Sequence, residues 1–175
     1  MTLRSDDLAV QLQTHLLAVF EAFREIQSRD RERPLTPSEH PGGSPWSATD
    51  HLAHVLEREW GFLAIGQRLI VADPDPTRIS LRGNTPAERD AFVNRQNQAQ
   101  VESHRGQSFE DLVEELRGAC EHRVQLLKGL ADEQLARPVP GAQRADVQWA
   151  ALLGSTHHAE AHLDMVRRAL AATRE

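Results

Sequence analysis

The sequence lacks the features on which several protein classes depend. Tyrosine is absent and the aromatic residues together make up 5% of the chain, which argues against a β-sandwich or barrel. A single cysteine, Cys120, excludes an internal disulfide framework and a zinc site built on a CxxC pair. No apolar run approaches the roughly 20 residues that a membrane span needs, and the first residues carry no signal-peptide core. We therefore expect a cytoplasmic protein that does not enter a membrane.

Several catalytic and nucleotide-binding motifs are also missing. The chain contains neither HExxH nor ExxH, which argues against zincin metalloproteases and ferritin-like di-iron proteins. The GxGxxG and Walker A patterns are absent, and nothing marks a Ser-His-Asp triad. Acidic residues outnumber lysine and arginine by 26 to 20, for a formal net charge of -6. That balance argues against nucleic acids and anionic membranes as partners.

What the sequence does contain is a set of amphipathic helices separated by proline- and glycine-rich breaks. Its 175 residues, of which 39% are hydrophobic, fit one domain spanning residues 1–175. Apolar residues recur at three- and four-residue steps, the period of a helix with one buried face. The predicted helices cover residues 3–29, 47–71, 85–103, 108–130 and 146–172, with a further turn at 132–135. Four long helices and a weaker one predict an all-α protein, an antiparallel four-helix bundle with an additional short helix.

Nine histidines stand out in this composition, and four of them lie at helical spacing on two predicted helices. His158 and His162 are four residues apart on the last helix, so their side chains share one face. Two imidazoles placed in this way can bind one metal ion. His51 and His54 lie on the second helix, and either could supply the third ligand of a three-histidine site. The apolar periodicity of that helix favours His51, which lies nearer the buried stripe.

Glu59 lies within the apolar stripe of the same helix. A buried carboxylate needs a partner, and three roles are compatible with the sequence. The carboxylate could orient a ligand histidine, act as a base in proton transfer, or pair with an arginine across the bundle. Trp46, which precedes the helix cap at Ser47, is interpreted as a packing residue, and Cys120 as a buried core residue.

Three segments of the chain resemble the DinB/YfiT-like superfamily. They are Trp46-Ser47 followed by His54-Val55-Leu56-Glu57-Arg58-Glu59, the segment SFEDLVEELRGACEHRVQLLKGLADEQLARP, and the HxxxH pair on the last helix. The resemblance extends over residues 5–172. It implies a four-helix bundle, often homodimeric, in which three histidines hold a divalent metal, typically zinc or nickel. The ligand positions of the family fall on His54, His158 and His162, with His51 kept as the alternative first ligand, and Glu59 matches a position that is often acidic.

The resemblance also implies an activity. Relatives include S-transferases that use mycothiol or bacillithiol and a mycothiol-dependent maleylpyruvate isomerase. By this likeness the metal activates a low-molecular-weight thiol, which attacks an electrophilic small molecule. Glu59 would orient a ligand or move a proton, and an arginine such as Arg58 or Arg144 would hold a carboxylate or sugar hydroxyl of the substrate.

Three other interpretations remain open at this point. The same site could serve a hydrolase that uses water activated by the metal. It could also belong to a non-catalytic metal-binding bundle of a stress response, in which no coordination position is open to a substrate. Finally, the chain could be a helical interaction module whose histidines are incidental. Metal content and the response of the metal to a thiol would distinguish these interpretations.

Overall fold

The computed structural model describes residues 4–38, 42–71, 85–139 and 147–173. The described residues form helices and no strand, apart from two isolated β-bridges, so the all-α class is confirmed. The helices are α1 (Ser5–Arg24), α2 (Ser28–Arg31), α3 (Ala48–Ile70), α4 (Pro86–Ser103), α5 (Phe109–Gly129), α6 (Asp132–Leu135), α7 (Trp149–Leu153) and α8 (His157–Ala172).

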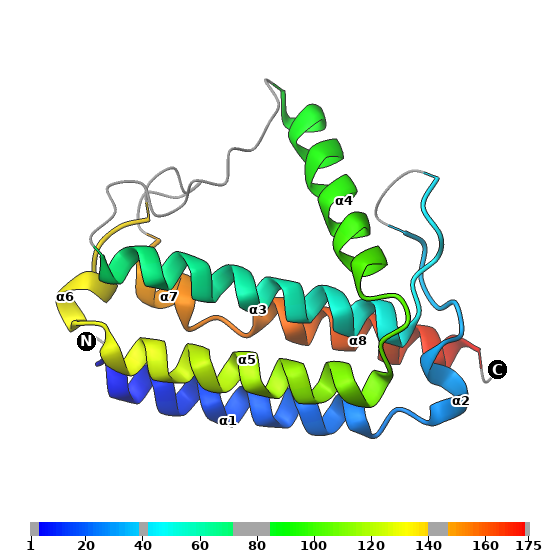
Figure 1. Cartoon of the computed structure of the whole chain (residues 1–175), viewed down its shortest axis with the longest axis horizontal. Coiled ribbons are helices and arrows are strands. Elements are labelled where there is room, and N and C mark those ends of the chain that lie inside the picture. The colour runs from blue at the N-terminus through cyan, green and yellow to red at the C-terminus, as the bar shows by residue number, and fades with distance from the viewer. Residues whose placement is uncertain (1–3, 39–41, 72–84, 140–146, 174–175) are drawn as a thin grey trace.

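Four rods of helix form the bundle: α1, α3, α5 and the α7–α8 pair (Figure 1). Helix α5 packs against α1 and α3, and α8 packs against the same two helices on the other side. Helices α3 and α5 run in one direction, while α1 and α8 run in the other (Figure 1). The additional helix, α4, contacts α3 and projects away from the bundle. The predicted four-helix bundle with an extra helix is therefore confirmed.

Polar caps fix where two of these helices, α3 and α4, begin. The Ser47 side chain accepts a hydrogen bond from the Asp50 backbone, and the Asp50 carboxylate accepts one from the Ser47 backbone. Thr85 and Glu88 form the same reciprocal pair at the start of α4. Each pair satisfies backbone donors that the first helical turn leaves without partners. These starts agree with the predicted ones to within a residue.

The C-terminal helix departs from the prediction. A single helix over residues 146–172 was expected, but the helical path stops after Leu153 and starts again at His157. Gly154 lies at the break, where a Cβ atom would come within 2.4 Å of Leu8 Cδ1 and 2.8 Å of the Ala150 carbonyl oxygen. Close packing of α1 on this segment therefore requires a glycine. The first helix likewise ends at Arg24 rather than near residue 29.

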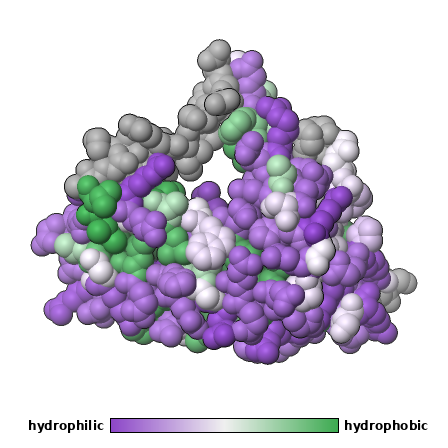
Figure 2. All heavy atoms as spheres, viewed as in Figure 1, coloured by the Kyte–Doolittle hydropathy of each residue, from purple (hydrophilic) through white to green (hydrophobic). Residues whose placement is uncertain are grey.

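One side of the bundle leaves apolar residues exposed. Trp60, Ile70 and Val71 are 39%, 51% and 74% exposed, and Figure 2 shows hydrophobic residues gathered over the C-terminal part of α3. A shallow groove between α3 and α5 continues this surface, and we call the two together the apolar face. The groove is lined by Trp60, Leu63, Ala64, Gln67, Ile70, His122, Gln125 and Leu126. None of the helices in the described ranges is long and apolar enough to cross a membrane.

Candidate metal centre

Four histidines face one another where α3 and α8 pack together. The two helices run antiparallel, so the earlier histidine of α3 meets the later histidine of α8. His51 Nδ1 lies 2.9 Å from His162 Nδ1, and His54 Nε2 lies 3.1 Å from His158 Nε2. His51, His54 and His162 are buried, and His158 is half-buried. The structure thus brings together all four histidines that the sequence singled out.

Three of the four form a group with the geometry of a metal site. His54, His158 and His162 each offer a ring nitrogen, and the three nitrogens lie within 4.8 Å of one another. Tetrahedral zinc, with bonds of about 2.0–2.1 Å to histidine nitrogens, holds its ligands about 3.3 Å apart. The 3.1 Å separation of the His54 and His158 nitrogens is close to that value. The three rings could therefore hold a single divalent ion between α3 and α8.

The electrostatics of the cluster keep three of its rings neutral, those of His51, His54 and His158, and the neutral ring is the form that binds a metal. Burial, reinforced by the other histidines, lowers the pKa of His51 to about 3 and that of His54 to about 2. Burial and His162 lower the pKa of His158 to about 3. The Nδ1 atoms of His54 and His158 are buried without a hydrogen-bond partner among the described residues. Clustered neutral imidazoles with unpaired nitrogens are the donor set that zinc and nickel favour.

His51 is held in a different way from the other three. Its Nδ1 contacts His162, and its Nε2 lies 2.8 Å from the Thr36 hydroxyl oxygen, so both ring nitrogens are already engaged. The periodicity argument placed His51 on the buried stripe correctly, since the side chain is fully buried. Burial, however, put it against Thr36 and His162 rather than into the three-nitrogen group. As an alternative first ligand, His51 would have to break one of these hydrogen bonds.

Trp46 belongs to the site, although the sequence suggested only a packing role. Its ring centroid lies 5.3 Å from that of His51, 5.2 Å from that of His54 and 6.2 Å from that of His162. Its indole nitrogen donates a hydrogen bond to Gln98 Oε1 of α4 at 3.1 Å. Trp46 therefore forms an apolar wall beside the histidines and ties them to α4. Its position directly before the cap of the histidine-bearing helix was the available signal.

Glu59 pairs with an arginine, one of the three roles left open by the sequence. Arg123 Nη1 donates to both carboxylate oxygens of Glu59, at 2.8 and 2.7 Å, and the two side chains are almost completely buried. The guanidinium also lies 4.0 Å from the centroid of the Phe62 ring. No described histidine contacts the carboxylate, so no observed contact supports a role for Glu59 in orienting a ligand or moving a proton.

Arg123 connects this buried pair to the chain that leads into α8. Its Nε donates to the Leu153 carbonyl at 2.9 Å, and its Nη2 donates to the Ser155 carbonyl at 2.7 Å. These carbonyl groups have lost their helical partners at the break between α7 and α8. The guanidinium replaces those partners and so fixes where α8 begins. Because His158 and His162 lie in the first two turns of α8, Arg123 also fixes their position.

Arg58 lies one helical turn after His54 on α3. Its guanidinium carbon lies 4.8 Å from the centroid of the Phe62 ring, and none of the described carboxylates forms an ion pair with it. Its positive charge contributes to the lowered pKa values of His54 and His158, which places it in the field of the cluster. Arg58 is exposed and is available to a ligand. Arg144 lies outside the described residues.

The other histidines lie away from the cluster. His157 and His122 are exposed, and His122 lies beside Trp60. His104 Nε2 lies 2.8 Å from a Glu57 carboxylate oxygen, as a link between the end of α4 and α3. His15 on α1 is exposed as well. His40 lies outside the described residues.

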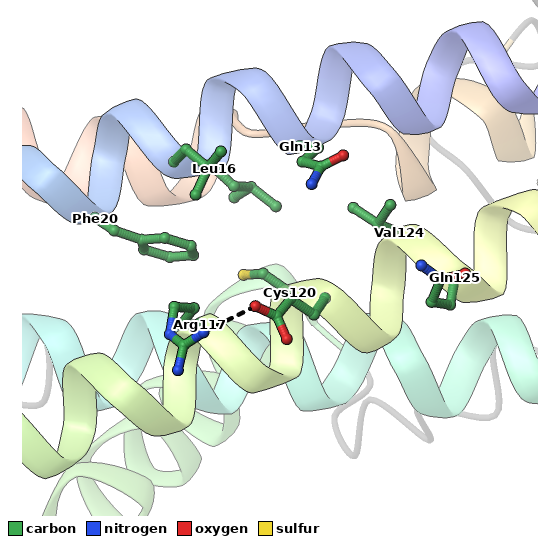
Figure 3. Close-up of a pocket in the computed structure, with 9 residues that line it drawn as sticks. Gln13, Leu16, Phe20, Arg117, Cys120, Val124 and Gln125 are labelled. Carbon is green, nitrogen blue, oxygen red and sulfur yellow. Dashed lines mark hydrogen bonds and ion pairs between the residues drawn. The ribbon is translucent and has the colours of Figure 1, made fainter.

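Cys120 lies in the core, as predicted. It is 3% exposed and lines a small groove between α1 and α5, where its sulfur faces Leu16 and Phe20 (Figure 3). Burial raises the pKa of its thiol, and the negative charge of Glu59 raises it further. A thiol with a raised pKa is a poor nucleophile at neutral pH. This groove therefore offers no second catalytic centre.

Comparisons with known proteins place this chain in a family. Residues 9–166 match the DinB superfamily, and the chain therefore belongs to that superfamily. A crystal structure of an uncharacterised protein from Escherichia coli UTI89 has the same fold, with a TM-score of 0.67 and 16% sequence identity. The alignment covers 98% of this chain and 95% of that one. No curated protein matches the sequence.

Proposed function

We propose that this protein is a metal-dependent enzyme that transfers a low-molecular-weight thiol to an electrophilic small molecule. The observation that supports it most is the group of three ring nitrogens, from His54, His158 and His162, within 4.8 Å of one another. Three protein ligands leave a coordination position open, which is typical of catalytic rather than structural metal sites. Zinc or nickel is the proposed metal, and mycothiol or bacillithiol the proposed thiol.

The role of the metal in this proposal is to favour the thiolate form of the bound thiol, which is the nucleophilic form. The protein supplies the remaining parts. The lowered pKa values of His54 and His158 keep both rings neutral and able to bind the metal at physiological pH. The Trp46 ring excludes water from one side of the site. Exclusion of water strengthens the electrostatic interactions inside such a site.

Arg58 is the proposed anchor for an anionic group of the substrate or thiol. The side chain is exposed, carries no ion pair to a described carboxylate, and follows His54 by one turn. A guanidinium in that state can bind a carboxylate through two parallel hydrogen bonds. Replacing Arg58 with Gln should then raise the KM for a carboxylate-bearing substrate about tenfold or more. Metal content should not change, because Arg58 is not a ligand.

Cobalt substitution tests the proposal directly. Tetrahedral Co²⁺ at the site has a visible absorption spectrum that changes when a new ligand binds. Mycothiol and bacillithiol, each added to the cobalt protein, should change that spectrum at a stoichiometry of one thiol per site. Thiol added to cobalt-treated His54→Ala protein is the control and should produce no such change. An unchanged spectrum with every thiol tested would contradict the thiol-transferase proposal.

The two rival functions predict different results in the same experiment. A hydrolase that uses water activated by the metal should leave the cobalt spectrum unchanged with thiols, yet should cleave ester or amide substrates. A non-catalytic metal-binding bundle should have no coordination position open, so neither thiols nor small anions should change the spectrum. Of the three functions, the thiol transferase predicts a cobalt spectrum that responds to a thiol and an activity that requires that thiol.

A homodimer is part of the same proposal. The apolar face carries exposed Trp60, Ile70 and Val71, and exposed apolar patches of this kind mark interaction surfaces. Sedimentation of the wild type should give the mass of two chains. The double variant Trp60→Glu with Ile70→Glu should sediment as one chain and keep its helical content. A wild type that sediments as one chain at micromolar concentration would contradict the dimer.

A further inference from the structure

His51 connects the metal centre to a threonine that lies outside the bundle helices. Its Nδ1 lies 2.9 Å from His162 Nδ1, and its Nε2 lies 2.8 Å from Thr36 Oγ1. The His51 ring is fully buried, so no bulk water competes for these contacts. The three side chains form a continuous chain from His162 through His51 to Thr36.

The chemistry of the rings sets the direction of this chain. Two imidazole nitrogens 2.9 Å apart must share one proton between them, with one ring as donor and the other as acceptor. A His162 that binds a metal through Nε2 carries its own proton on Nδ1. That proton is then donated to His51 Nδ1. The remaining proton of His51 must lie on Nε2, where it is donated to the Thr36 hydroxyl oxygen.

Backbone hydrogen bonds fix the position of Thr36. Thr36 and Trp46 form an antiparallel β-bridge, in which the Trp46 nitrogen donates to the Thr36 carbonyl at 2.8 Å. The Thr36 nitrogen donates to the Trp46 carbonyl at 3.1 Å in return. The Trp46 ring then packs edge-on against the His51 ring. The same short bridge thus positions both the hydroxyl and the ring that hold His51.

We propose that His51 and Thr36 are positioning residues that hold His162 in the Nδ1-protonated tautomer and so present its Nε2 to the metal. The proposal rests on the metal site proposed above, because His162 is one of its ligands. Ligand histidines commonly donate their second nitrogen to a carboxylate or a carbonyl oxygen, and loss of that partner weakens metal affinity about 10–100-fold. Here a second histidine takes the place of the oxygen acceptor. The tautomers of the other two proposed ligands are not set in this way, since the Nδ1 atoms of His54 and His158 have no hydrogen-bond partner among the described residues.

Two variants of His51 test whether its ring acts as a hydrogen-bond acceptor or only fills space. His51→Asn keeps an acceptor oxygen at the place of Nδ1, whereas His51→Leu fills space and accepts no hydrogen bond. Zn²⁺ affinity, measured by competition with a chelator, should fall about 10–100-fold in His51→Leu. His51→Asn should stay within a few-fold of the wild type. Thr36→Val removes only the outer contact and should lower the affinity by less than His51→Leu does.

A matched control accounts for losses of general stability. Val124→Ala removes buried methyl groups from α5, away from the histidines, and should destabilise the fold without changing Zn²⁺ affinity. Equal affinities for His51→Leu and His51→Asn would overturn the proposal. A fall in affinity for Val124→Ala as large as that for His51→Leu would overturn it as well.

The tautomer itself can be observed without any metal. Long-range ¹⁵N–¹H correlation spectra of the metal-free protein should show His162 protonated on Nδ1 in the wild type. His51→Leu should give a mixture of tautomers for His162, and His51→Asn should restore the wild-type form. A wild-type His162 protonated on Nε2 would contradict the positioning role. If the wild type shows the expected tautomer but binds no metal, the proposed function is wrong. The hydrogen-bonded chain from His162 through His51 to Thr36 would still be supported.

Discussion

Arg123 donates two hydrogen bonds to Glu59 beside the break between α7 and α8. The same guanidinium binds the carbonyl groups of Leu153 and Ser155, which the helix break exposes. A buried arginine requires a counter-charge, because desolvation of an unpaired guanidinium is very costly. Glu59 supplies that charge, so the carboxylate on α3 helps to set, through Arg123, the start of the helix that carries His158 and His162.

Glu59→Gln should destabilise the protein by about 3–5 kcal/mol, because it leaves a buried charge without its partner. Chemical denaturation followed by circular dichroism measures this change. Arg117→Gln is the control, since Arg117 forms exposed ion pairs with Glu114 and Glu121 and its loss should change stability little. A Glu59→Gln protein as stable as the control would contradict the structural role assigned to the pair.

The double variant Glu59→Met with Arg123→Met tests the second function of the arginine. Replacing both charges removes the unpaired-charge penalty, so the double variant should be more stable than Glu59→Gln alone. It should still fall short of the wild type, because the Leu153 and Ser155 carbonyls lose their donors. Full recovery of wild-type stability would mean that the break between α7 and α8 does not depend on Arg123.

Gly154→Ala should destabilise the protein by about 1–3 kcal/mol. The added Cβ would lie 2.4 Å from Leu8 Cδ1 and 2.8 Å from the Ala150 carbonyl oxygen, so the α1 packing must shift. Gly118→Ala is a matched control in α5, where a Cβ meets nothing within 4 Å. Alanine is the better helix former there by about 0.5–1 kcal/mol, so this control should gain stability. Thermal unfolding of both variants checks the opposite signs.

The link between His104 and Glu57 should make stability depend on pH. Burial opposes the charged form of His104, but hydrogen bonds to Gln107 and Glu57 and the charge of Glu115 outweigh it and raise the pKa. Because the pKa is higher in the folded state, the protonated pair adds stability below about pH 6.5. This stability is lost as the pH rises through the folded-state pKa. The pair is partly exposed, so the contribution should be under about 1 kcal/mol.

Glu57→Gln isolates this contribution. Unfolding free energies of the wild type and the variant, compared between pH 5.5 and 8.5, should differ most at the acidic end and converge at the alkaline end. A difference that grows with rising pH would have the wrong sign for this link.

Local patterns predicted the helices well because local chemistry sets their ends. The capping pairs at Ser47 and Thr85 act within four residues, so the sequence alone contains them. The break at Gly154 depends on Leu8 and on Arg123, which are distant in the chain. The HxxxH pair lies wholly within α8, so its spacing gives no sign of the break that precedes this helix. A helix that ends because of a tertiary contact is invisible to a search for periodicity.

The site shows the same division between local and tertiary information. The i, i+4 spacing of His158 and His162 predicted that they share a face, which the structure bears out. Periodicity identified His51 as buried but could not tell that Thr36 would occupy its second nitrogen. The likeness to the superfamily favoured His54, and His54 lies in the three-nitrogen group. Glu59 and Arg123 are 64 residues apart, so only the packing of α5 on α3 reveals the pair.

The metal content of the purified protein tests the central claim most directly. The wild type, His54→Ala and His157→Ala should each be loaded with Zn²⁺, passed over a desalting column and analysed by mass spectrometry for bound metal. His157 is exposed beside the proposed ligand His158, so its variant controls for changes at the start of α8. The account predicts about one zinc per chain in the wild type and in His157→Ala, and a loss of most of it in His54→Ala. A wild type without zinc, or a His54→Ala protein that keeps it, would contradict the three-histidine centre.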